Sequence, residues 1–318
     1  MISNSLKSDN RPIYAIAGPT ASGKTALAVD LALSVGGEVV NFDSVQIYKG
    51  IEIATAKPTV EEMRDVPHHL IDYVDPRVNY TAVDWAADAA KKIAEIESRE
   101  NVPVLVGGTG FSLRTLRQPL FEGPKTSSEL RERLHELKTR KGNEWIHRML
   151  KRIDPASAGQ LYPNDYVRVM RALEFYFQTG RRFSGEKPKR LSPPEFADRI
   201  KLYVLDPPRN ELYEKIDRRT ESHFAAGLIG EVKQLIASGV SETTNALGAH
   251  GYRRVCEYIR GERSLKSAIE RSKQDVRNYA KRQLTWFRRE PDAVWLQGFG
   301  SDSGIIDHIL NQFDTEKH

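Results

Sequence analysis

The chain has 318 residues, 39% of them hydrophobic and 29% charged, which is typical of a globular protein of about two domains. Its one cysteine, Cys256, excludes a disulfide framework, a zinc knuckle and a Cys-x-x-Cys redox pair. No stretch approaches the ~18 consecutive apolar residues of a membrane-spanning helix, and the polar first ten residues lack the apolar run of a signal peptide. We therefore expect a cytoplasmic protein.

The net charge of +5 conceals two strongly basic segments. Residues 125–190 contain 16 lysines and arginines against 8 acidic residues, and residues 251–290 contain 12 against 5. Two basic segments on an otherwise acidic chain indicate an extended polyanion as the partner. From charge alone, the alternative is a pair of solvated helices with surplus basic residues.

The first part of the chain alternates predicted strands and helices. The apolar residues 12–17 predict a buried strand, and apolar residues at every fourth position predict a helix over 27–35. Residues 38–42 and 102–106 predict two more strands, with an amphipathic helix over 80–99 between them. This alternation is typical of a parallel sheet with helices on both faces.

The pattern then changes. Residues 120–190 show charged helical patterns and no strong strand, and a proline-rich linker follows as far as Pro194. Beyond it, the sequence predicts a strand over 200–205, then long helices and a last strand over 293–296. We therefore predict an α/β core interrupted by a helical insertion domain, and we assign the core to residues 1–119 and 196–318 and the insertion to residues 120–195.

A phosphate-binding motif joins the first strand to the first helix. Residues 18–25 match G-x-x-x-x-G-K-[ST] in full, and in this context the glycines let backbone N–H groups surround a phosphate at a helix N-terminus. The Lys24 ammonium would reach the terminal phosphate, and the Thr25 hydroxyl would ligate Mg²⁺. The core is therefore P-loop NTPase-like, and we predict phosphate binding by Gly18, Pro19, Thr20, Ala21, Ser22, Gly23, Lys24 and Thr25.

The ends of the other two strands narrow the chemistry. A nucleotide hydrolase places an acid at the end of a core strand, whereas the strand over 102–106 ends in Gly-Gly-Thr-Gly. Hydrolysis is therefore disfavoured, which leaves phosphoryl transfer, or transfer of another group away from a phosphate leaving group. Asp43 follows the second strand, where it would accept a proton from a nucleophile, cap a turn or support a magnesium ion.

Taken in order, the motifs of this chain resemble those of the tRNA dimethylallyltransferase family, also called tRNA isopentenyltransferases. The phosphate-binding motif alone is generic, but the ordered set is specific and extends over residues 12–297. The resemblance rests on GPTASGKT at 18–25, DSVQIYKG at 43–50, TAKP at 55–58, PHHLID at 67–72, VGGTG at 106–110, PND at 163–165, RALE at 171–174, TG at 179–180, LY…I..R at 212–219, GL…EV at 227–232, GYR at 251–253 and KRQLTWFR at 281–288.

The resemblance implies a transfer reaction on RNA. It implies that a dimethylallyl group passes from dimethylallyl diphosphate to N6 of the adenine next to the anticodon, position 37, in tRNAs that read codons beginning with U. Diphosphate leaves, Mg²⁺ assists, and the phosphate-binding motif holds the prenyl diphosphate rather than ATP. Asp43 would take the proton from N6, Thr109 would hydrogen-bond the oxygen between the prenyl group and the diphosphate, and Arg219 would bind the diphosphate with Lys24.

The resemblance also implies how tRNA is bound. The helical insertion would grip the anticodon stem-loop, and we expect the protein to act as a monomer. The tRNA-contacting positions implied are Asp43, Ser44, Val45, Gln46, Thr109, Arg131, Val167, Arg168, Val169, Met170, Arg171, Gly248, Ala249, His250, Gly251, Tyr252, Arg253, Lys281, Arg282, Gln283, Leu284, Thr285, Trp286, Phe287 and Arg288.

Two other functions remain open at this point. One is a P-loop kinase of a nucleotide or small metabolite, in which the basic insertion closes over ATP and Asp43 serves as the base. The other is an RNA-binding protein that retains an inactive phosphate-binding loop. The chain also departs from the family pattern at Ala54, Phe111, Ser112, His250 and Arg254, and these departures leave the four predicted diphosphate and catalytic side chains unchanged.

Three further titratable residues need an interpretation. The pair His68 and His69 invites a metal site, but no partner cluster accompanies it, so a structural or tRNA-adjacent role is favoured. Glu174 follows a helical pattern next to two phenylalanines, and we interpret it as an acid on the helix surface.

Overall fold

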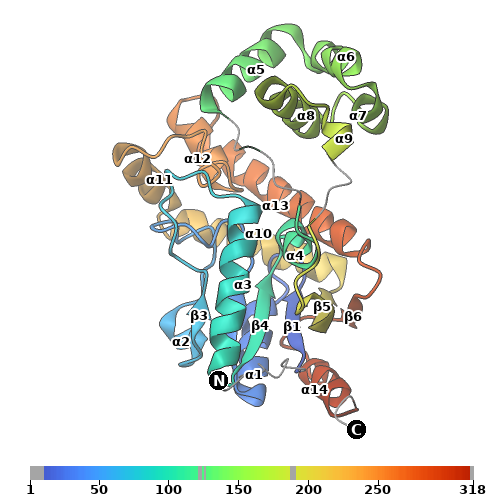
Figure 1. Cartoon of the computed structure of the whole chain (residues 1–318). Helices are drawn as coiled ribbons and strands as arrows, with labels where there is room; N and C mark the ends of the chain where they lie inside the picture. Colours follow the sequence, from blue (N-terminus) through green and yellow to red (C-terminus); the bar gives the residue numbers. More distant parts are fainter. Residues whose placement is uncertain (1–10, 121–123, 125–126, 187–190, 316–318) are drawn as a thin grey trace. The chain divides into compact units, whose positions relative to one another are not determined.

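The computed structural model describes residues 11–120, 124, 127–186 and 191–315 (Figure 1). The polar first ten residues considered above lie outside this range. Within it, no helix is both long and apolar enough to cross a lipid bilayer.

A six-stranded sheet forms the centre of the fold (Figure 1), and all its strand pairs are parallel, in the order β3-β2-β4-β1-β5-β6. The predicted parallel sheet is confirmed. The strand β3 was not predicted, because two polar histidines carry none of the apolar signal of a buried strand. The strands are β1 (Ile13–Ala17), β2 (Gly37–Asn41), β3 (His68–His69), β4 (Val102–Gly107), β5 (Ile200–Asp206) and β6 (Val294–Gln297).

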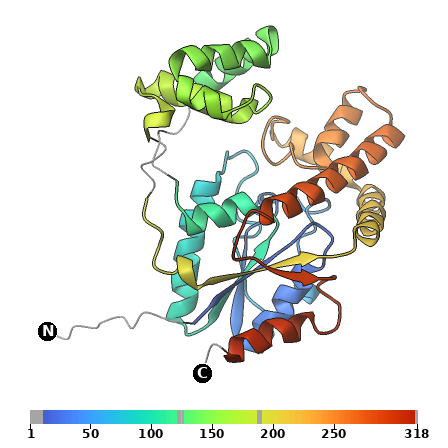
Figure 2. The same cartoon turned by 90° about the vertical axis from the view of Figure 1, so that its right-hand side faces the viewer.

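Helices cover both faces of the sheet, as predicted. One face packs against α3 (Ala82–Ser98) and α4 (Gly110–Arg117), and the other against α1 (Lys24–Val35) and α14 (Ile305–Thr315), which lie together (Figure 2). Side chains of β1 alternate between the two cores, so every residue of this central strand is buried. That double burial is why the strand reads as a continuous apolar run.

Four helices of the core follow β5 in the sequence. They are α10 (Arg209–Ala225), α11 (Leu228–Ala237), α12 (Tyr252–Ile259) and α13 (Leu265–Phe287). Leu212 and Ile216 of α10 pack with Ala280 of α13, and Phe287 at the end of α13 is buried in the core beneath α3. These contacts fix α10 and α13 beside the carboxyl ends of the strands. Short elements complete this part: α2 (Val60–Met63) and a 3₁₀ helix (Ala197–Arg199).

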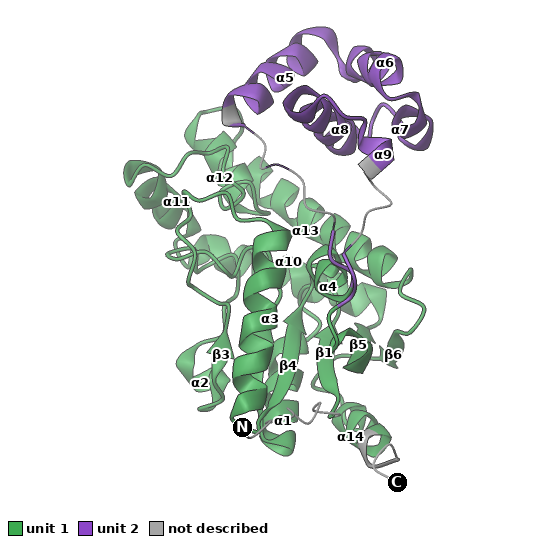
Figure 3. Ribbon diagram, viewed as in Figure 1, with its two compact units in different colours: residues 1–117, 194–318 green, residues 118–193 purple. Residues whose placement is uncertain are grey.

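The chain divides into two compact units (Figure 3), residues 1–117 with 194–318 and residues 118–193. Each bound falls two residues before the limits of 120 and 195 expected for the insertion. The described residues of the second unit form helices and no strand: α5 (Ser128–Lys141), α6 (Asn143–Ile153), α7 (Pro155–Gln160), α8 (Tyr166–Thr179) and α9 (Phe183–Glu186).

The second unit has a small core of its own, built from Ile146 and Leu150 of α6 and Leu173 of α8. Glu174 lies beside this core and is 4% exposed, and Arg131 Nε donates to its carboxylate at 3.1 Å. Our interpretation of Glu174 as a surface acid is therefore wrong. Two arginines compensate the buried charge, Arg171 of the same helix at 3.7 Å and Arg131 of another helix, and periodicity within α8 could not predict the second.

Candidate active site

The register of the sheet brings three loops together. Ala17 of β1 pairs with Gly107 of β4, and Asn41 of β2 pairs with Val106 of β4. The loops that leave these three neighbouring strands therefore begin at one edge of the sheet. One of these loops carries the predicted phosphate-binding residues, and the other two carry Asp43 and Thr109. The carboxyl edge of a parallel sheet is where such folds bind ligands.

The phosphate-binding loop leaves an anion site at the start of α1. Gly23 precedes the helix with φ of +83°, a conformation that favours glycine. No side chain caps the helix, so its first N–H groups remain available to an anion. Ser22 Oγ is also buried without a hydrogen-bond partner in the described part of the chain. Loop and helix are thus arranged as the motif predicts.

Two cationic side chains face this loop without compensating partners. The Lys24 ammonium has one long contact, 3.4 Å to the carbonyl of Pro19. Burial lowers the pKa of Lys24 to about 8; the Asp43 carboxylate opposes that shift and the Arg219 charge adds to it. Burial likewise lowers the pKa of Arg219, against the effect of Asp43. No described residue forms an ion pair with Lys24 or Arg219, so both positive charges are available to bind an anion.

Asp43 is held by a turn that leaves half of its carboxylate available. Its Oδ1 accepts hydrogen bonds from the backbone N–H groups of Val45 at 2.9 Å and Gln46 at 3.3 Å. Its own N–H donates to Asn41 Oδ1 at 3.1 Å. Among the described residues, Oδ2 has no hydrogen-bond partner. Asp43 can therefore cap the turn with Oδ1 and still offer Oδ2 as a base.

Thr109 lies across from this turn. Its Oγ1 accepts from the Ser44 N–H at 3.1 Å and donates to Ser44 Oγ at 3.3 Å. A hydroxyl proton rotates to suit its acceptor, so this donor can turn toward a ligand oxygen. The structure thus brings Asp43, Thr109, Lys24 and Arg219 to one site, although they lie far apart in the sequence.

One side chain of α13 ties the site together. Gln283 Oε1 accepts from the Thr20 N–H at 2.9 Å, and its Nε2 donates to the Gly108 carbonyl at 3.1 Å. A Cβ at Gly108 would lie 1.9 Å from that nitrogen, so the glycine permits the contact. Gln283 is only 4% exposed, which corrects our expectation that its side chain contacts tRNA.

Sequence reasoning missed Tyr279, one turn before Gln283. Its hydroxyl lies close to the side chains of Thr109 and Gln283, and burial raises its pKa, as does the charge of Asp43. The four-residue spacing to Gln283 was the signal that these two side chains share one helix face. Their common face is directed to the reaction site and not to solvent.

A small pocket opens beside Asp43, with oxygen donors in its wall. It is lined by Lys24, Thr25, Asn41, Asp43, Gln46, Pro58, His68, Ile71, Val106 and Gly107. Hydroxyl, carboxylate and amide oxygens suit Mg²⁺, which is held by few protein oxygens together with phosphates and water. In the described ranges, no three His, Cys, Asp or Glu side chains gather as a metal cage. His68 was not predicted as a site residue, although its motif was noted.

Two sets of hydrogen bonds hold the loop around residues 53–56, which lies near the pocket. Gln46 Nε2 donates to the carbonyls of Thr55 at 3.0 Å and Ala56 at 2.9 Å. From α11, Glu231 accepts the Tyr252 hydroxyl at 2.5 Å and the N–H of Ile53 at 3.1 Å. Tyr252 is fully buried, and burial raises its pKa. This tyrosine therefore supports the loop, which differs from our expectation of a contact with tRNA.

The remaining predicted tRNA positions divide by exposure. Val169, Met170 and Phe287 are buried core residues, so their side chains are not available to RNA, and Gly251 is buried as well. We therefore restrict the predicted tRNA contacts to the exposed positions. These are Ser44, Arg131, Val167, Arg168, Gly248, Arg253, Lys281, Arg282, Thr285 and Arg288. The partly exposed members are Val45, Arg171, Ala249, His250, Leu284 and Trp286.

Comparison with known proteins identifies the family. The family model described as IPP transferase matches residues 46–290. The tRNA dimethylallyltransferase of Geobacter metallireducens is 43% identical over 295 residues, which cover 93% of this chain and 95% of that protein.

Two solved structures share the fold. The tRNA isopentenylpyrophosphate transferase of Bacillus halodurans is 35% identical, with a TM-score of 0.70 and coverage of 96% of this chain and 98% of that one. A eukaryotic dimethylallyltransferase acting on tRNA is 28% identical, with a TM-score of 0.75 and coverage of 96% and 76%. With the match to the family model and the identity of its relatives, the chain belongs to the IPP transferase family.

Proposed function

We propose that this protein is a tRNA dimethylallyltransferase that transfers the dimethylallyl group of dimethylallyl diphosphate to N6 of the adenine at position 37. Prenyl transfer to tRNA is the activity that its relatives are named for. The donor, the adenine and the preference for tRNAs reading codons beginning with U follow from the sequence resemblance. The chain belongs to a family whose relatives are named for transfer to tRNA, which argues against the metabolite kinase.

One observation carries this proposal: Lys24 and Arg219 have no ion-pair partner among the described residues and lie within electrostatic reach of Asp43. Two uncompensated cations suit a leaving group whose negative charge grows as the bond to carbon breaks. A neighbouring carboxylate suits an amine that becomes positive as it attacks. Preorganised charge of this kind is usually the largest contribution to catalysis.

The reaction balances with these groups alone. The N6 lone pair of adenine forms a bond to C1 of the prenyl group, and the C1–O bond breaks with its electron pair going to diphosphate. Asp43 Oδ2 accepts the proton that N6 loses. The Thr109 hydroxyl would donate to the departing oxygen, while Lys24, Arg219 and the N–H groups of the loop bind the diphosphate.

The residues present also fit Mg²⁺. Thr25 would supply a hydroxyl ligand, because it lies at the start of α1 and lines the pocket beside Asp43. When bound, the ion would neutralise charge on the diphosphate. The buried Nε2 of His68, which has no partner in the described part of the chain, is a second observation that favours a hydrated group in this pocket.

Binding of tRNA would use the exposed basic residues of both units. The adenine must leave its stack in the anticodon loop to reach Asp43, at a cost of a few kcal/mol. Phosphate contacts from arginine and lysine would offset this cost, and loop bases would give selectivity. We assign Arg131 and the exposed start of α8 to the anticodon stem-loop. We also propose that the protein acts as a monomer in the cytoplasm.

The test is transfer of labelled dimethylallyl diphosphate to unmodified tRNA by the purified protein. We expect label in the RNA, located by mass spectrometry at the adenine next to the anticodon. The Asp43→Asn variant keeps the Oδ1 that accepts hydrogen bonds from the N–H groups of the turn, but it loses the carboxylate that would serve as the base. It should bind tRNA normally while single-turnover transfer falls at least ~100-fold, the usual size of general-base catalysis.

Other outcomes would identify the alternatives. Phosphate passing from ATP to a metabolite with no labelled RNA would show a kinase. Tight binding of tRNA without turnover, in the original protein and in Asp43→Asn alike, would show an RNA-binding protein with an inactive loop.

A further inference from the structure

The two adjacent histidines of β3 have different roles. His69 Nε2 lies 2.6 Å from the Glu38 carboxylate, which also accepts from Arg99 and Asn101, so this ring is fully engaged in holding the edge strand. Successive side chains of a strand point to opposite faces. His68 accordingly faces the other way, and it lines the pocket beside Asp43.

The hydrogen bond of His68 determines its tautomer. Its Nδ1 lies 2.8 Å from the carbonyl of Val66, and a carbonyl only accepts, so Nδ1 carries the proton. Burial lowers the pKa of His68, which keeps the ring neutral near pH 7. Nε2 is then a bare acceptor. It is buried and has no partner among the described residues. A buried acceptor without a donor is costly, so it calls for a ligand that donates.

The position of His68 decides which donor fits. Phosphate oxygens accept hydrogen bonds and cannot satisfy Nε2. The register pairs His68 with Val39, which belongs to the core on the α1 face of the sheet, and α1 begins with Lys24 and Thr25. His68 thus shares a wall with the residue expected to hold the cation. The water shell of a divalent cation consists of donors, and Mg²⁺ retains several of its waters.

We propose that His68 is a positioning residue for the divalent cation: its Nε2 accepts a hydrogen bond from a water bound to the ion that Thr25 and the diphosphate hold. This inference rests on the proposed function of the site. Groups beyond the direct ligands orient them, and their loss typically weakens metal binding 10- to 100-fold. His68 would act through the water and would not touch the reacting atoms.

Three variants of the full-length protein separate this role from a structural one. His68→Asn retains an amide that can donate to Val66 but lacks the free acceptor at the Nε2 position. His68→Gln places an amide oxygen near that position. His69→Asn is the matched control, because it makes the same change in the neighbouring ring that holds Glu38. Titration calorimetry would measure Mg²⁺ affinity in the presence of saturating inorganic diphosphate, and thermal unfolding would monitor the fold.

We expect His68→Asn to weaken Mg²⁺ binding at least ~10-fold with little change in Tm, and His68→Gln to restore affinity to within ~3-fold, because its oxygen replaces the lost acceptor. His69→Asn should lower Tm and leave Mg²⁺ affinity unchanged. Unchanged affinity in His68→Asn, or slower transfer at saturating Mg²⁺ without loss of affinity, would overturn the inference and leave the proposed function standing. If the original protein with diphosphate bound no Mg²⁺, both would fall.

Discussion

Lys24 shows how a single functional residue works against stability. Its side chain is partly buried near a second cation, and burial lowers its pKa to about 8, so the fold disfavours the charge that diphosphate binding would require. An apolar side chain of similar length would remove this cost. The departing diphosphate would compensate it in the working enzyme.

We therefore predict that Lys24→Met loses diphosphate affinity by ~100-fold or more, since a charge-assisted contact is removed, while Tm rises. A gain of ~1 kcal/mol would correspond to roughly 2–4 °C in a chain of this size. Isothermal titration and differential scanning calorimetry would measure the two effects. Lys49→Met, at an exposed position, is the control and should change neither. A lower Tm for Lys24→Met would contradict the prediction.

The same residue predicts a pH dependence. The folded pKa of Lys24, about 8, lies below the usual 10.5, so between these values the unfolded chain binds more protons and the Lys24 contribution to stability rises with pH. Diphosphate favours the charged form, so its affinity should fall as pH rises above 8. Affinity measured from pH 6.5 to 9.5 should show this decline, and Lys24→Arg, which stays charged, should lack it.

At the scale of elements, α13 supports the candidate active site and also carries exposed basic residues that we propose to contact tRNA. Gln283 joins the phosphate-binding loop to the end of β4, while Lys281, Arg282 and Thr285 on the same helix are exposed. One helix therefore couples the position of the diphosphate to the surface that would meet tRNA. The pattern of basic residues alone predicted only the second role.

We predict that Gln283→Ala destabilises the protein by ~1–3 kcal/mol for each of the two backbone groups left buried without a partner. The loop would then lose its fixed shape, and the KM for the prenyl donor should rise ~10-fold, the effect of about 1.4 kcal/mol. Gln274→Ala, an exposed glutamine of the same helix, is the control. Steady-state kinetics and urea unfolding provide the measurements, and an unchanged KM in Gln283→Ala would remove the supporting role.

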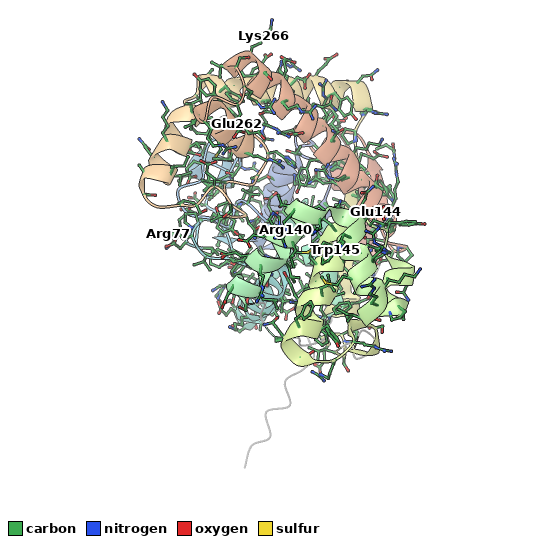
Figure 4. The ribbon with its side chains drawn as sticks, turned by 90° about the horizontal axis from the view of Figure 1, so that it is seen from above. Arg77, Arg140, Glu144, Trp145, Glu262 and Lys266 are labelled. Carbon is green, nitrogen blue, oxygen red and sulfur yellow. The ribbon has the colours of Figure 1, made fainter. Side chains whose placement is uncertain are left out.

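At the scale of the whole molecule, two basic segments, residues 125–190 and 251–290, contrast with the acidic remainder of the sequence. Several of its arginines are already committed to ion pairs, as Arg254 is with Asp275 at 2.6 Å. The Lys281 ammonium has no hydrogen bond or ion pair with any described residue, which leaves its charge available to a phosphate. Lys266 lies in the first turn of the same helix and projects from the surface in Figure 4.

We predict that tRNA affinity falls steeply with salt, and that Lys281→Gln reduces the slope of log affinity against log salt by about 0.7–0.9, the value of one phosphate contact. Lys266→Gln is the matched control, because it removes the same charge about 22 Å away along the helix. Fluorescence anisotropy of a labelled anticodon stem-loop between 50 and 200 mM salt would measure both. Equal slopes for the two variants would place Lys281 outside the tRNA interface.

The sequence by itself determined the features that depend on residues close to one another along the chain. Apolar runs predicted five of the six strands, because a strand in a sheet that helices cover on both faces is largely apolar. The spacing of Gly18, Gly23 and Lys24 predicted the phosphate site, since one loop supplies all its groups. Asp43 and Thr109 were placed at the correct edge because parallel strands share their carboxyl ends.

Only the tertiary structure decided the properties that depend on which elements lie opposite one another. The buried Glu174 is contacted by Arg131 from another helix as well as by Arg171 of its own, and the support given by Gln283 requires two loops from distant parts of the chain. Two adjacent histidines became one engaged ring and one free acceptor through strand pairing alone. Periodicity describes one face of an element, whereas compensation of a buried charge or polar group depends on the face that it meets.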